Sequence, residues 1–271
     1  MSFSCLISCY KNDNPIQLSK CLDSLINQSL KANEIVFVKD GELSKDLEKI
    51  LNLYIDKLPF VFVNLPTNKG LGNALNEGLL VCKNNIVIRM DTDDICLPNR
   101  FEKQYNYLIK NKEVDIVGSW AYDIDIDDNI IGERKYPLSH DKIYQLMWTN
   151  PIIHPAVAFR KDKILKIGSY DIYLKRRQDY ELWIRAAYEG LKFSNIGEFL
   201  LLYRFTENYY KKNNTKVAYD QALMGFNGAR KLDLPFYTKI AVFIPVLRSL
   251  LPSQLIGPVH KLMSKFDPRK S

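Results

Sequence analysis

Short apolar runs alternate with helical patterns along the first hundred residues. In the first intervening segment, apolar residues recur at helical spacing after Asn14 and Pro15, which favour a helix start. The runs themselves have the length and continuity of strands buried on both faces, and they lie at 3–9, 34–41, 60–65 and 86–90. Strands that alternate in this way with helices predict an α/β protein with a single Rossmann-like sheet and helices on both faces.

The pattern becomes less regular after residue 97. The expected elements are a helix from Pro98, a strand at 114–120, a β-hairpin at 122–136, helices at 139–148 and 176–190, and a loop at 150–164 that leads into a strand. A polar stretch at 206–216 precedes a last apolar and basic region. We therefore expect one domain over residues 1–205 and a helical C-terminal extension over 206–271.

Length and composition agree with one large domain. The chain has 271 residues, of which 46% are hydrophobic, enough for a sizeable core. The pattern of a signal peptide is not seen, and apolar runs stay short of membrane-spanning length. The five cysteines form no C-x-x-C pair and lie in apolar surroundings, which predicts reduced structural thiols in the cytoplasm.

Three carboxylates follow the strand at 86–90, namely Asp91, Asp93 and Asp94. In open α/β sheets, ligands bind beyond the carboxyl ends of the strands, where Asp40 and the 67–73 loop are also expected. Clustered carboxylates repel one another, so a cation is expected among them. A hard divalent ion that takes its other ligands from a phosphorylated substrate suits the pattern. An acidic turn that caps the next helix remains the alternative interpretation.

The hairpin at 122–136 imitates a calcium-binding loop. Asp123, Asp125 and Asp127 have the spacing of its first ligands. However, Asp128 occupies the position that requires glycine, and Arg134 occupies the position of the final glutamate. We therefore expect no metal site in the hairpin.

Several segments together resemble a known family. ISCYKND, VKDG, NKGLGNALNEG and MDTDD occur in order in the first half, and NPIIHPAVAFR and RRQDYELWIR follow in the second. This pattern resembles the family 2 glycosyltransferases of the GT-A fold over roughly residues 3–205. The resemblance implies a donor-binding half at 1–120 and an acceptor half at 121–205.

The resemblance implies roles for the residues of the donor half. Asp40 would accept a hydrogen bond from uracil, although Lys39 stands where the family often has another acid. Asp93 would hold Mn²⁺ or Mg²⁺ on the diphosphate of the donor, with Asp91 on the metal or the ribose. Other donor-binding residues implied are Ser8, Cys9, Tyr10, Asn68, Lys69, Gly70 and Thr92.

On the acceptor side, the resemblance implies that Asp179 is the general base of an inverting transfer. His154, Arg176 and Arg177 would lie near the diphosphate of the acceptor. Each also has a structural interpretation: Asp179 as a residue of a helix N-terminus, His154 as a buried histidine and the arginines as solvated charges. The implied reaction moves a hexose from UDP-galactose or UDP-glucose to a polyprenyl-diphosphate-linked sugar, in O-antigen or capsule assembly.

The rival interpretations are a metal-dependent nucleotidyltransferase and a nucleic-acid-binding protein. The first should carry a glycine-rich loop after its first strand, which SCYKNDNP lacks. The second would use the basic tail, since residues 229–271 hold eight Lys or Arg against two Asp in a chain of net charge +7. That tail also has an apolar stripe, which favours an anionic membrane surface at the cytoplasmic face, with packing on the protein's own core as the alternative. The stripe comprises Ile240, Phe243, Ile244, Leu247, Leu250 and Leu251.

Overall fold

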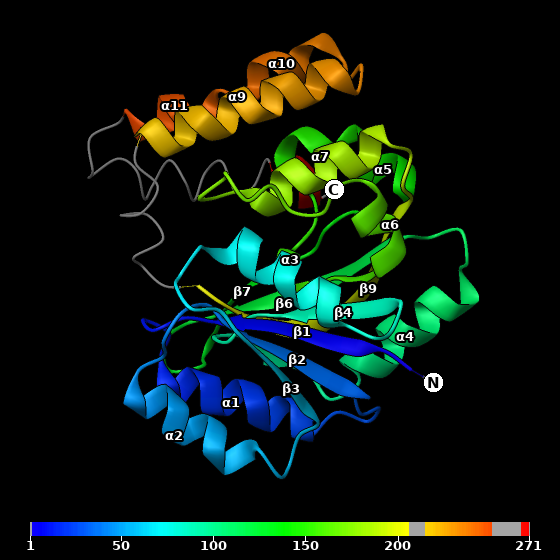
Figure 1. Cartoon of the computed structure of the whole chain (residues 1–271). Helices are drawn as coiled ribbons and strands as arrows, with labels where there is room; N and C mark the ends of the chain where they lie inside the picture. Colours follow the sequence, from blue (N-terminus) through cyan, green and yellow to red (C-terminus); the bar gives the residue numbers. More distant parts are fainter. Residues whose placement is uncertain (1, 206–214, 251–266, 271) are drawn as a thin grey trace.

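The computed structural model describes residues 2–205, 215–250 and 267–270 (Figure 1). The strands are β1 (Ser4–Cys9), β2 (Glu34–Lys39), β3 (Phe60–Asn64), β4 (Ile86–Met90), β5 (Ile95–Cys96), β6 (Ile116–Ile124), β7 (Ile130–Arg134), β8 (Ala158–Arg160) and β9 (Phe193–Arg204). The α-helices are α1 (Pro15–Ile26), α2 (Lys45–Tyr54), α3 (Leu71–Val81), α4 (Arg100–Lys110), α5 (His140–Gln145), α6 (Lys161–Lys166), α7 (Gln178–Tyr188), α9 (Thr215–Lys231), α10 (Phe236–Ala241) and α11 (Ile244–Ser249). Short 3₁₀ turns are η1 (Met147–Thr149), η2 (His154–Ala156) and η4 (Pro268–Lys270).

The strands form one mixed sheet in the order β3-β2-β1-β4-β8-β6-β9-β5, with β7 paired to β6. The first four strands are parallel, as the alternating pattern predicts. β8 runs antiparallel to both β4 and β6, and β9 runs parallel to β6. The parallel part therefore ends at β4, the strand that leads into the acidic residues.

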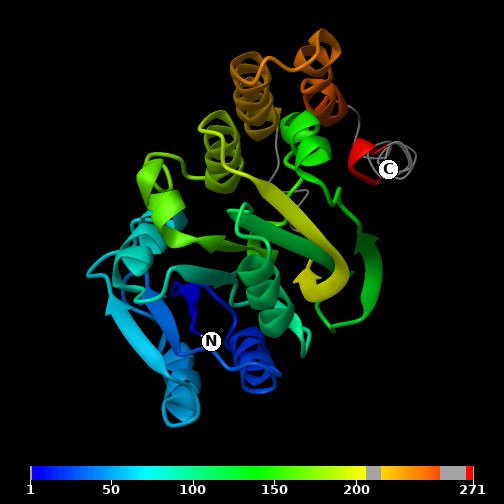
Figure 2. The ribbon, with the colours of Figure 1, turned by 90° about the vertical axis from the view of Figure 1, so that its right-hand side faces the viewer.

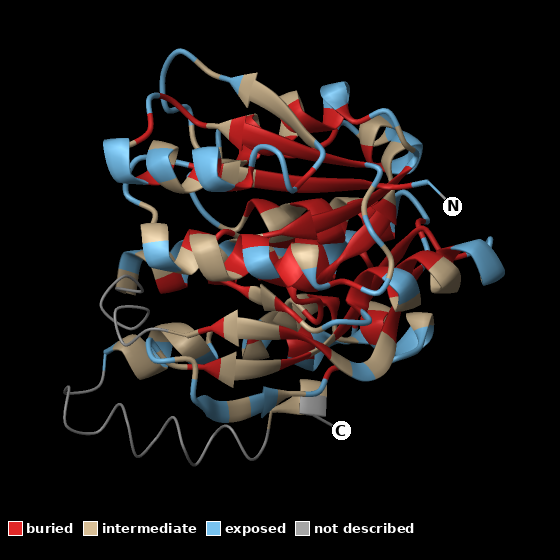
Figure 3. Ribbon diagram, turned by 90° about the horizontal axis from the view of Figure 1, so that it is seen from below, coloured by how far each residue is buried: buried red, intermediate tan, exposed pale blue. Residues whose placement is uncertain are grey.

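Helices cover both faces of the sheet, as expected (Figures 1 and 2). One hydrophobic core joins the sheet to α1, α2 and α4, and a second joins it to α3, α5, α6 and α7. Figure 3 shows the buried residues concentrated along the strands between these layers. The five cysteines are buried and unbridged, as predicted.

Local signals in the sequence explain several helix starts. The side chain of Asn14 accepts hydrogen bonds from the backbone of Ile16 at 2.9 Å and of Gln17 at 3.3 Å, and so caps α1. The start predicted at Pro98 is wrong by two residues. α4 begins at Arg100, after a turn in which its N–H donates to the carbonyl of Leu97 at 3.1 Å.

The long strand β9 is not predicted from the sequence. Its residues do not alternate regularly, and its pairing with β6 contains register shifts around Trp120. β9 also pairs with the two-residue strand β5 that follows the acidic cluster. The sheet therefore surrounds residues 91–94 with strands from both halves of the chain.

The C-terminal helices pack on the far side of α7 from the sheet (Figures 1 and 2). Glycines in α9 allow close approach: a Cβ at Gly225 would lie 2.7 Å from the Tyr180 hydroxyl, and one at Gly228 would lie 2.6 Å from Ile184 Cδ1. The residues after α9 also join the second core through Leu232 and Leu234. In the described part of the chain, none of the helices has the length and apolarity needed to cross a membrane.

Candidate active site

Asp40 organises the edge of the site beyond β1 and β2. Its backbone N–H donates to the carbonyl of Cys9 at 2.8 Å. Its carboxylate, 5% exposed, accepts from the backbone N–H groups of Lys69 at 2.8 Å and Gly70 at 3.0 Å. The predicted proximity of Asp40 to the 67–73 loop is confirmed. Each carboxylate oxygen retains a further lone pair with which it could accept a bond from a ligand.

Ser8, Cys9 and Tyr10, the predicted donor-binding residues at the end of β1, differ in how far their side chains are exposed. Ser8 is half-buried and Tyr10 is 40% exposed at this edge. The side chain of Cys9 lies in the core, and burial raises the pKa of its thiol well above the usual value. Side chains alternate along a strand, so Cys9 contributes to the edge through its carbonyl oxygen and not through its sulfur.

The acidic residues after β4 form a compact cluster. Oxygens of Asp91, Asp93 and Asp94 all lie within 4.8 Å of one another, and this is the one such group found in the described residues. Burial, followed by the neighbouring Asp91 and Asp13, raises the pKa of Asp93 to about 7. Asp94 accepts from the backbone N–H of Arg204 at 2.7 Å, while its Oδ2 is buried with no partner in the described structure. Crowded carboxylates with unused oxygens fit a hard divalent cation.

Asp13 is a fourth carboxylate that sequence reasoning missed. It accepts from the hydroxyl of Thr92 at 2.9 Å and from the backbone of Tyr10 at 3.2 Å. Thr92 is thus directed at Asp13, and it ties the acidic turn to the end of β1. The sequence contains a signal for this role. The residue directly before Pro15, Asn14, caps α1, so Asp13 is not needed as the cap.

Arg89 supplies the positive charge inside the cluster. Its side chain is 1% exposed and forms an ion pair with Asp91, while its Nε and Nη1 have no partner in the described structure. Arg89 interrupts the apolar run that predicts β4, and sequence reasoning overlooked it. A buried charge within such a run needs a counter-charge, so an arginine there predicts an acidic partner nearby.

On the acceptor side, α7 carries Asp179 in its first turn. The side-chain amide of Asn150 donates to Asp179 Oδ2 at 3.0 Å. Burial raises the pKa of the Tyr170 phenol, and the charges of Arg89, Asp179 and Asp91 also act on it.

The remaining acceptor-side residues have different surroundings. His154 is buried, with its Nε2 2.9 Å from the Tyr170 hydroxyl, and burial followed by Arg89 lowers its pKa well below the usual value. The lowered pKa favours a neutral imidazole, and Tyr170 is its hydrogen-bond partner. Arg176 is exposed, and Arg177 stands at the start of α7 with a left-handed φ of 64°.

The acidic hairpin uses its carboxylates internally. Asp123 forms an ion pair with Arg134. Asp125 Oδ1 accepts from the backbone N–H groups of Asp127 and Asn129, both at 2.9 Å. Asp128 lies between Arg204 and Lys20. These contacts accord with the expectation that the hairpin is not a metal site.

Comparisons with known proteins agree with this geometry. Residues 4–168 match the model of "Glycosyl transferase family 2". The amylovoran biosynthesis glycosyltransferase AmsE of Erwinia amylovora is 43% identical over 203 residues, which cover 74% of this chain and 76% of that protein. The UDP-Gal:alpha-D-GlcNAc-diphosphoundecaprenol beta-1,3-galactosyltransferase of Escherichia coli is 31% identical over 96% of this chain and 95% of its own length.

Among solved structures, residues 1–349 of S. aureus TarS in complex with UDP-GlcNAc superpose with a TM-score of 0.69 at 16% identity, over 92% of this chain and 72% of that one. This chain spans 43% of the longer TarS chain. The likeness shows the fold, and the sequence matches show the family. The chain is a glycosyltransferase of family 2, with the GT-A fold.

Proposed function

We propose that this enzyme is an inverting, divalent-metal-dependent hexosyltransferase that uses a UDP-sugar, UDP-galactose or UDP-glucose, and a polyprenyl-diphosphate-linked sugar acceptor. The observation that carries the proposal is the carboxylate cluster after β4, together with Asp179 in the first turn of α7, whose carboxylate accepts a hydrogen bond from the amide of Asn150. The activity for which the E. coli relative is named supports the donor and acceptor classes. The amylovoran relative supports a role in surface polysaccharide assembly.

The donor side would hold the nucleotide and its diphosphate. Asp40, held by the 69–70 backbone, would accept a hydrogen bond from uracil, and Asn68 and Lys69 are exposed beside it. Asp91 and Asp93, with Asp94 next to them, would hold Mn²⁺ or Mg²⁺. Such an ion, when bound, neutralises charge that develops on the leaving diphosphate. Arg89 fixes the carboxylate of Asp91 from the protein interior.

The acceptor side would activate the attacking hydroxyl. Asp179 takes the proton of the acceptor hydroxyl as that oxygen forms a bond to the anomeric carbon. The bond between this carbon and the diphosphate oxygen breaks on the opposite face, so UDP leaves and the configuration inverts. Arg176, exposed near the start of α7, would pair with the diphosphate of the acceptor.

The test is a donor screen with purified enzyme. UDP-galactose, UDP-glucose and their N-acetylated counterparts would be supplied with a synthetic lipid-diphosphate-GlcNAc acceptor, with and without EDTA. We expect one hexose to be transferred, with an inverted anomeric configuration by NMR, and no transfer in EDTA. Retention of configuration or full activity in EDTA would contradict the proposed mechanism. The family assignment leaves the nucleotidyltransferase alternative without support.

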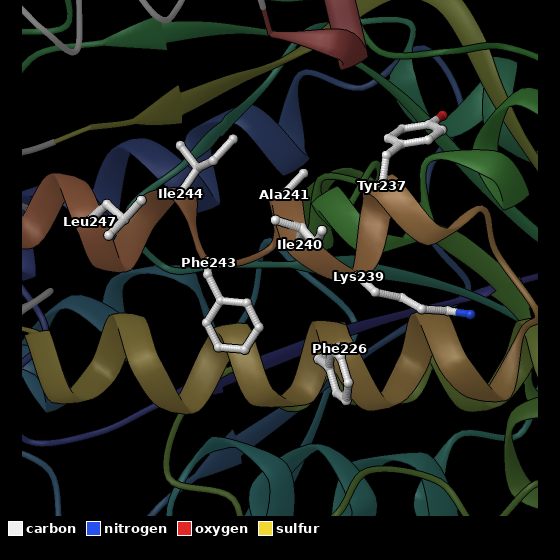
Figure 4. A pocket seen from close by; sticks show the side chains of 8 residues that line it. All are labelled: Phe226, Tyr237, Lys239, Ile240, Ala241, Phe243, Ile244 and Leu247. Carbon is white, nitrogen blue, oxygen red and sulfur yellow. The ribbon is translucent and has the colours of Figure 1, made fainter.

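We also propose that the enzyme is cytoplasmic and lies on an anionic membrane surface through α10 and α11. Next to these helices is an apolar hollow of about 590 Å³ (Figure 4). Ile240 is 61% exposed and Leu247 is 65% exposed, although Val242 packs inward. The two helices carry Lys239 and Arg248 and no acidic residue. Apolar side chains with basic neighbours suit an interfacial helix. Other basic residues of the tail, Lys261 and Lys265, lie outside the described residues.

A vesicle experiment tests this surface. We expect the protein to sediment with anionic vesicles and to be released only partly by high salt, because salt does not screen the apolar contribution. Ile240→Ser with Leu247→Ser should weaken binding at least about tenfold, because it removes two exposed apolar side chains that the membrane would bury. Leu53→Ser is the matched control, since Leu53 is 62% exposed on α2, a helix of the other layer. Unchanged binding of the double variant, or a preference for DNA over vesicles, would overturn the assignment.

A further inference from the structure

We infer that Asn150 is the positioning residue that orients Asp179, an inference that rests on the proposed role of Asp179 as the base. Asn150 ends η1 in the left-handed region, with φ 55°. Glycine would adopt this conformation without strain, but it would provide no side chain. The side-chain amide of Asn150 instead donates to Asp179 Oδ2 at 3.0 Å. This contact gives a reason for asparagine at a strained position.

Asp179 needs such a partner because of its place in α7. Arg177, in the cap position before α7, provides no side-chain acceptor for the first N–H groups of the helix. A carboxylate in the first turn is attracted to those groups and to the positive end of the helix dipole. The other acidic residue of the turn, Glu181, is held by Arg185. Without Asn150, Asp179 would therefore turn toward its own helix and away from the acceptor hydroxyl.

The orientation of the Asn150 amide is also determined. Its Oδ1 is buried and has no partner in the described structure. Rotating the amide by 180° would place Oδ1 against a carboxylate oxygen of Asp179. Because a buried unpaired carbonyl costs free energy, the donor contact to Asp179 is what holds this arrangement. The bond occupies one lone pair of Oδ2, which leaves Oδ1 of Asp179 as the more available oxygen for the proton.

The turn that carries Asn150 is held by three hydrogen bonds, one within the turn and two from other elements. The hydroxyl of Tyr180 donates to the carbonyl of Trp148 at 2.7 Å, and the hydroxyl of Thr149 donates to the carbonyl of Leu146 at 2.6 Å. From the C-terminal turn, Arg269 Nη1 donates to the carbonyl of Thr149 at 3.2 Å. A rigid support of this kind is what a positioning residue requires, since displacement of a reacting group by 1 Å can cost about 100-fold in rate.

Two substitutions test the inference. Asn150→Gly keeps the backbone conformation and removes the amide, and Asn150→Asp keeps the shape and replaces the donor with a like charge. Transfer would be measured with the UDP-hexose found active in the screen and the synthetic acceptor. We expect kcat to fall about 10-fold in Asn150→Gly and about 100-fold in Asn150→Asp. KM for the acceptor and UDP affinity by calorimetry should stay within about twofold, because neither depends on the orientation of the base.

Controls separate positioning from stability. Asp233→Gly replaces another left-handed residue, φ 50°, which is exposed after α9, and should leave kcat unchanged. Adding Asn150→Gly to Asp179→Asn should not lower kcat any further, because the two groups act as one unit. A wild-type kcat in both Asn150 variants, or a parallel loss of UDP affinity, would overturn the inference. If Asp179→Asn transfers at the wild-type rate, Asp179 is not the base and Asn150 has no such role. If transfer falls in Asp179→Asn but not in the Asn150 variants, Asp179 remains the base and the inference about Asn150 is refuted.

Discussion

On the donor side of the site, the left-handed backbone positions are glycines, Gly41 with φ 84° and Gly70 with φ 93°. In the acceptor half they include the glycines Gly168 and Gly190, but also Asn150, Ser169 and Arg177, with φ of 55°, 57° and 64°. A glycine adopts this region without strain, whereas any other residue there lowers the stability of the folded state by roughly 1–2 kcal/mol. The donor side is therefore held mainly by the sheet and its turns. The acceptor side depends on side-chain contacts, such as the hydroxyl of Ser169 on Asn76 at 2.6 Å.

The largest expected effect lies on the acceptor side. Asp179→Asn keeps the size of the side chain but cannot accept a proton, so transfer should fall about 1,000-fold, within the range for general base catalysis. UDP binding, measured by calorimetry, should remain near wild type because the donor side is built separately. If transfer and UDP binding fall together, the two sides are not independent and the comparison fails.

Asp93→Ala addresses the donor side. Transfer should fall at least about 100-fold, the loss expected when a main electrostatic stabiliser is removed. The measurement is the transfer rate as a function of Mn²⁺ and Mg²⁺ concentration. The matched control replaces Asp123, Asp125 and Asp127 with Asn, and the metal concentration for half-activity should stay within about threefold. A larger shift in the control would mean that the hairpin contributes ligands.

Glycine substitutions measure how closely the donor turns are packed. A Cβ at Gly41 would lie 2.7 Å from the backbone nitrogen of Asn68, whereas one at Gly190, with φ 80°, would meet nothing within 4 Å. Gly190→Ala should lower the free energy of unfolding by about 1 kcal/mol from strain alone. Gly41→Ala should cost at least about 2 kcal/mol more, because the backbone must also shift. Urea unfolding gives both values, and equal losses would show that the turn at Gly41 adapts.

The smallest expected effect is on acid stability. The pKa of His154 is lowered in the folded protein by burial and by Arg89, while in the unfolded chain it is about 6.5. The unfolded state therefore binds the proton first as the pH falls below about 6.5, and folding stability decreases there. Between pH 7.5 and 5.5 the wild type should lose roughly 1.4 kcal/mol more than His154→Gln. The same slope in both proteins would show that His154 is protonated inside the fold.

Much of the donor side could be predicted from the sequence. β1, β2 and β4 are mostly apolar runs, and the parallel arrangement places Asp40, the 67–73 loop and Asp91 at one edge without any knowledge of side-chain contacts. What the pattern does not reveal is which buried polar groups pair. Asp13 was missed because its partner Thr92 is 79 residues away in the sequence. Arg89 was missed although its partner Asp91 is only two residues away, because it lies next to an apolar run that already predicts a strand.

The acceptor side was harder to predict because its backbone carries no local marker. Nothing in the letters around Asn150 or Arg177 indicates a left-handed residue, as a glycine would. β9 was missed because its sequence lacks regular alternation, and its partner β6 extends further than its apolar run suggests. These features depend on contacts between segments far apart in the chain, which single-sequence patterns do not encode.

The pairing of β5 with β9 has a consequence for the order of folding. The four parallel strands and the helices between them come from the first 90 residues, so they can associate while the rest of the chain is still being synthesised. The acidic turn cannot be completed then. Its Asp94 is fixed by the backbone of Arg204, and the side chain of Arg204 donates to the carbonyl of Asp93 at 2.8 Å. The residues proposed to hold the metal should therefore be the last part of the donor side to become ordered, which keeps a half-made chain inactive.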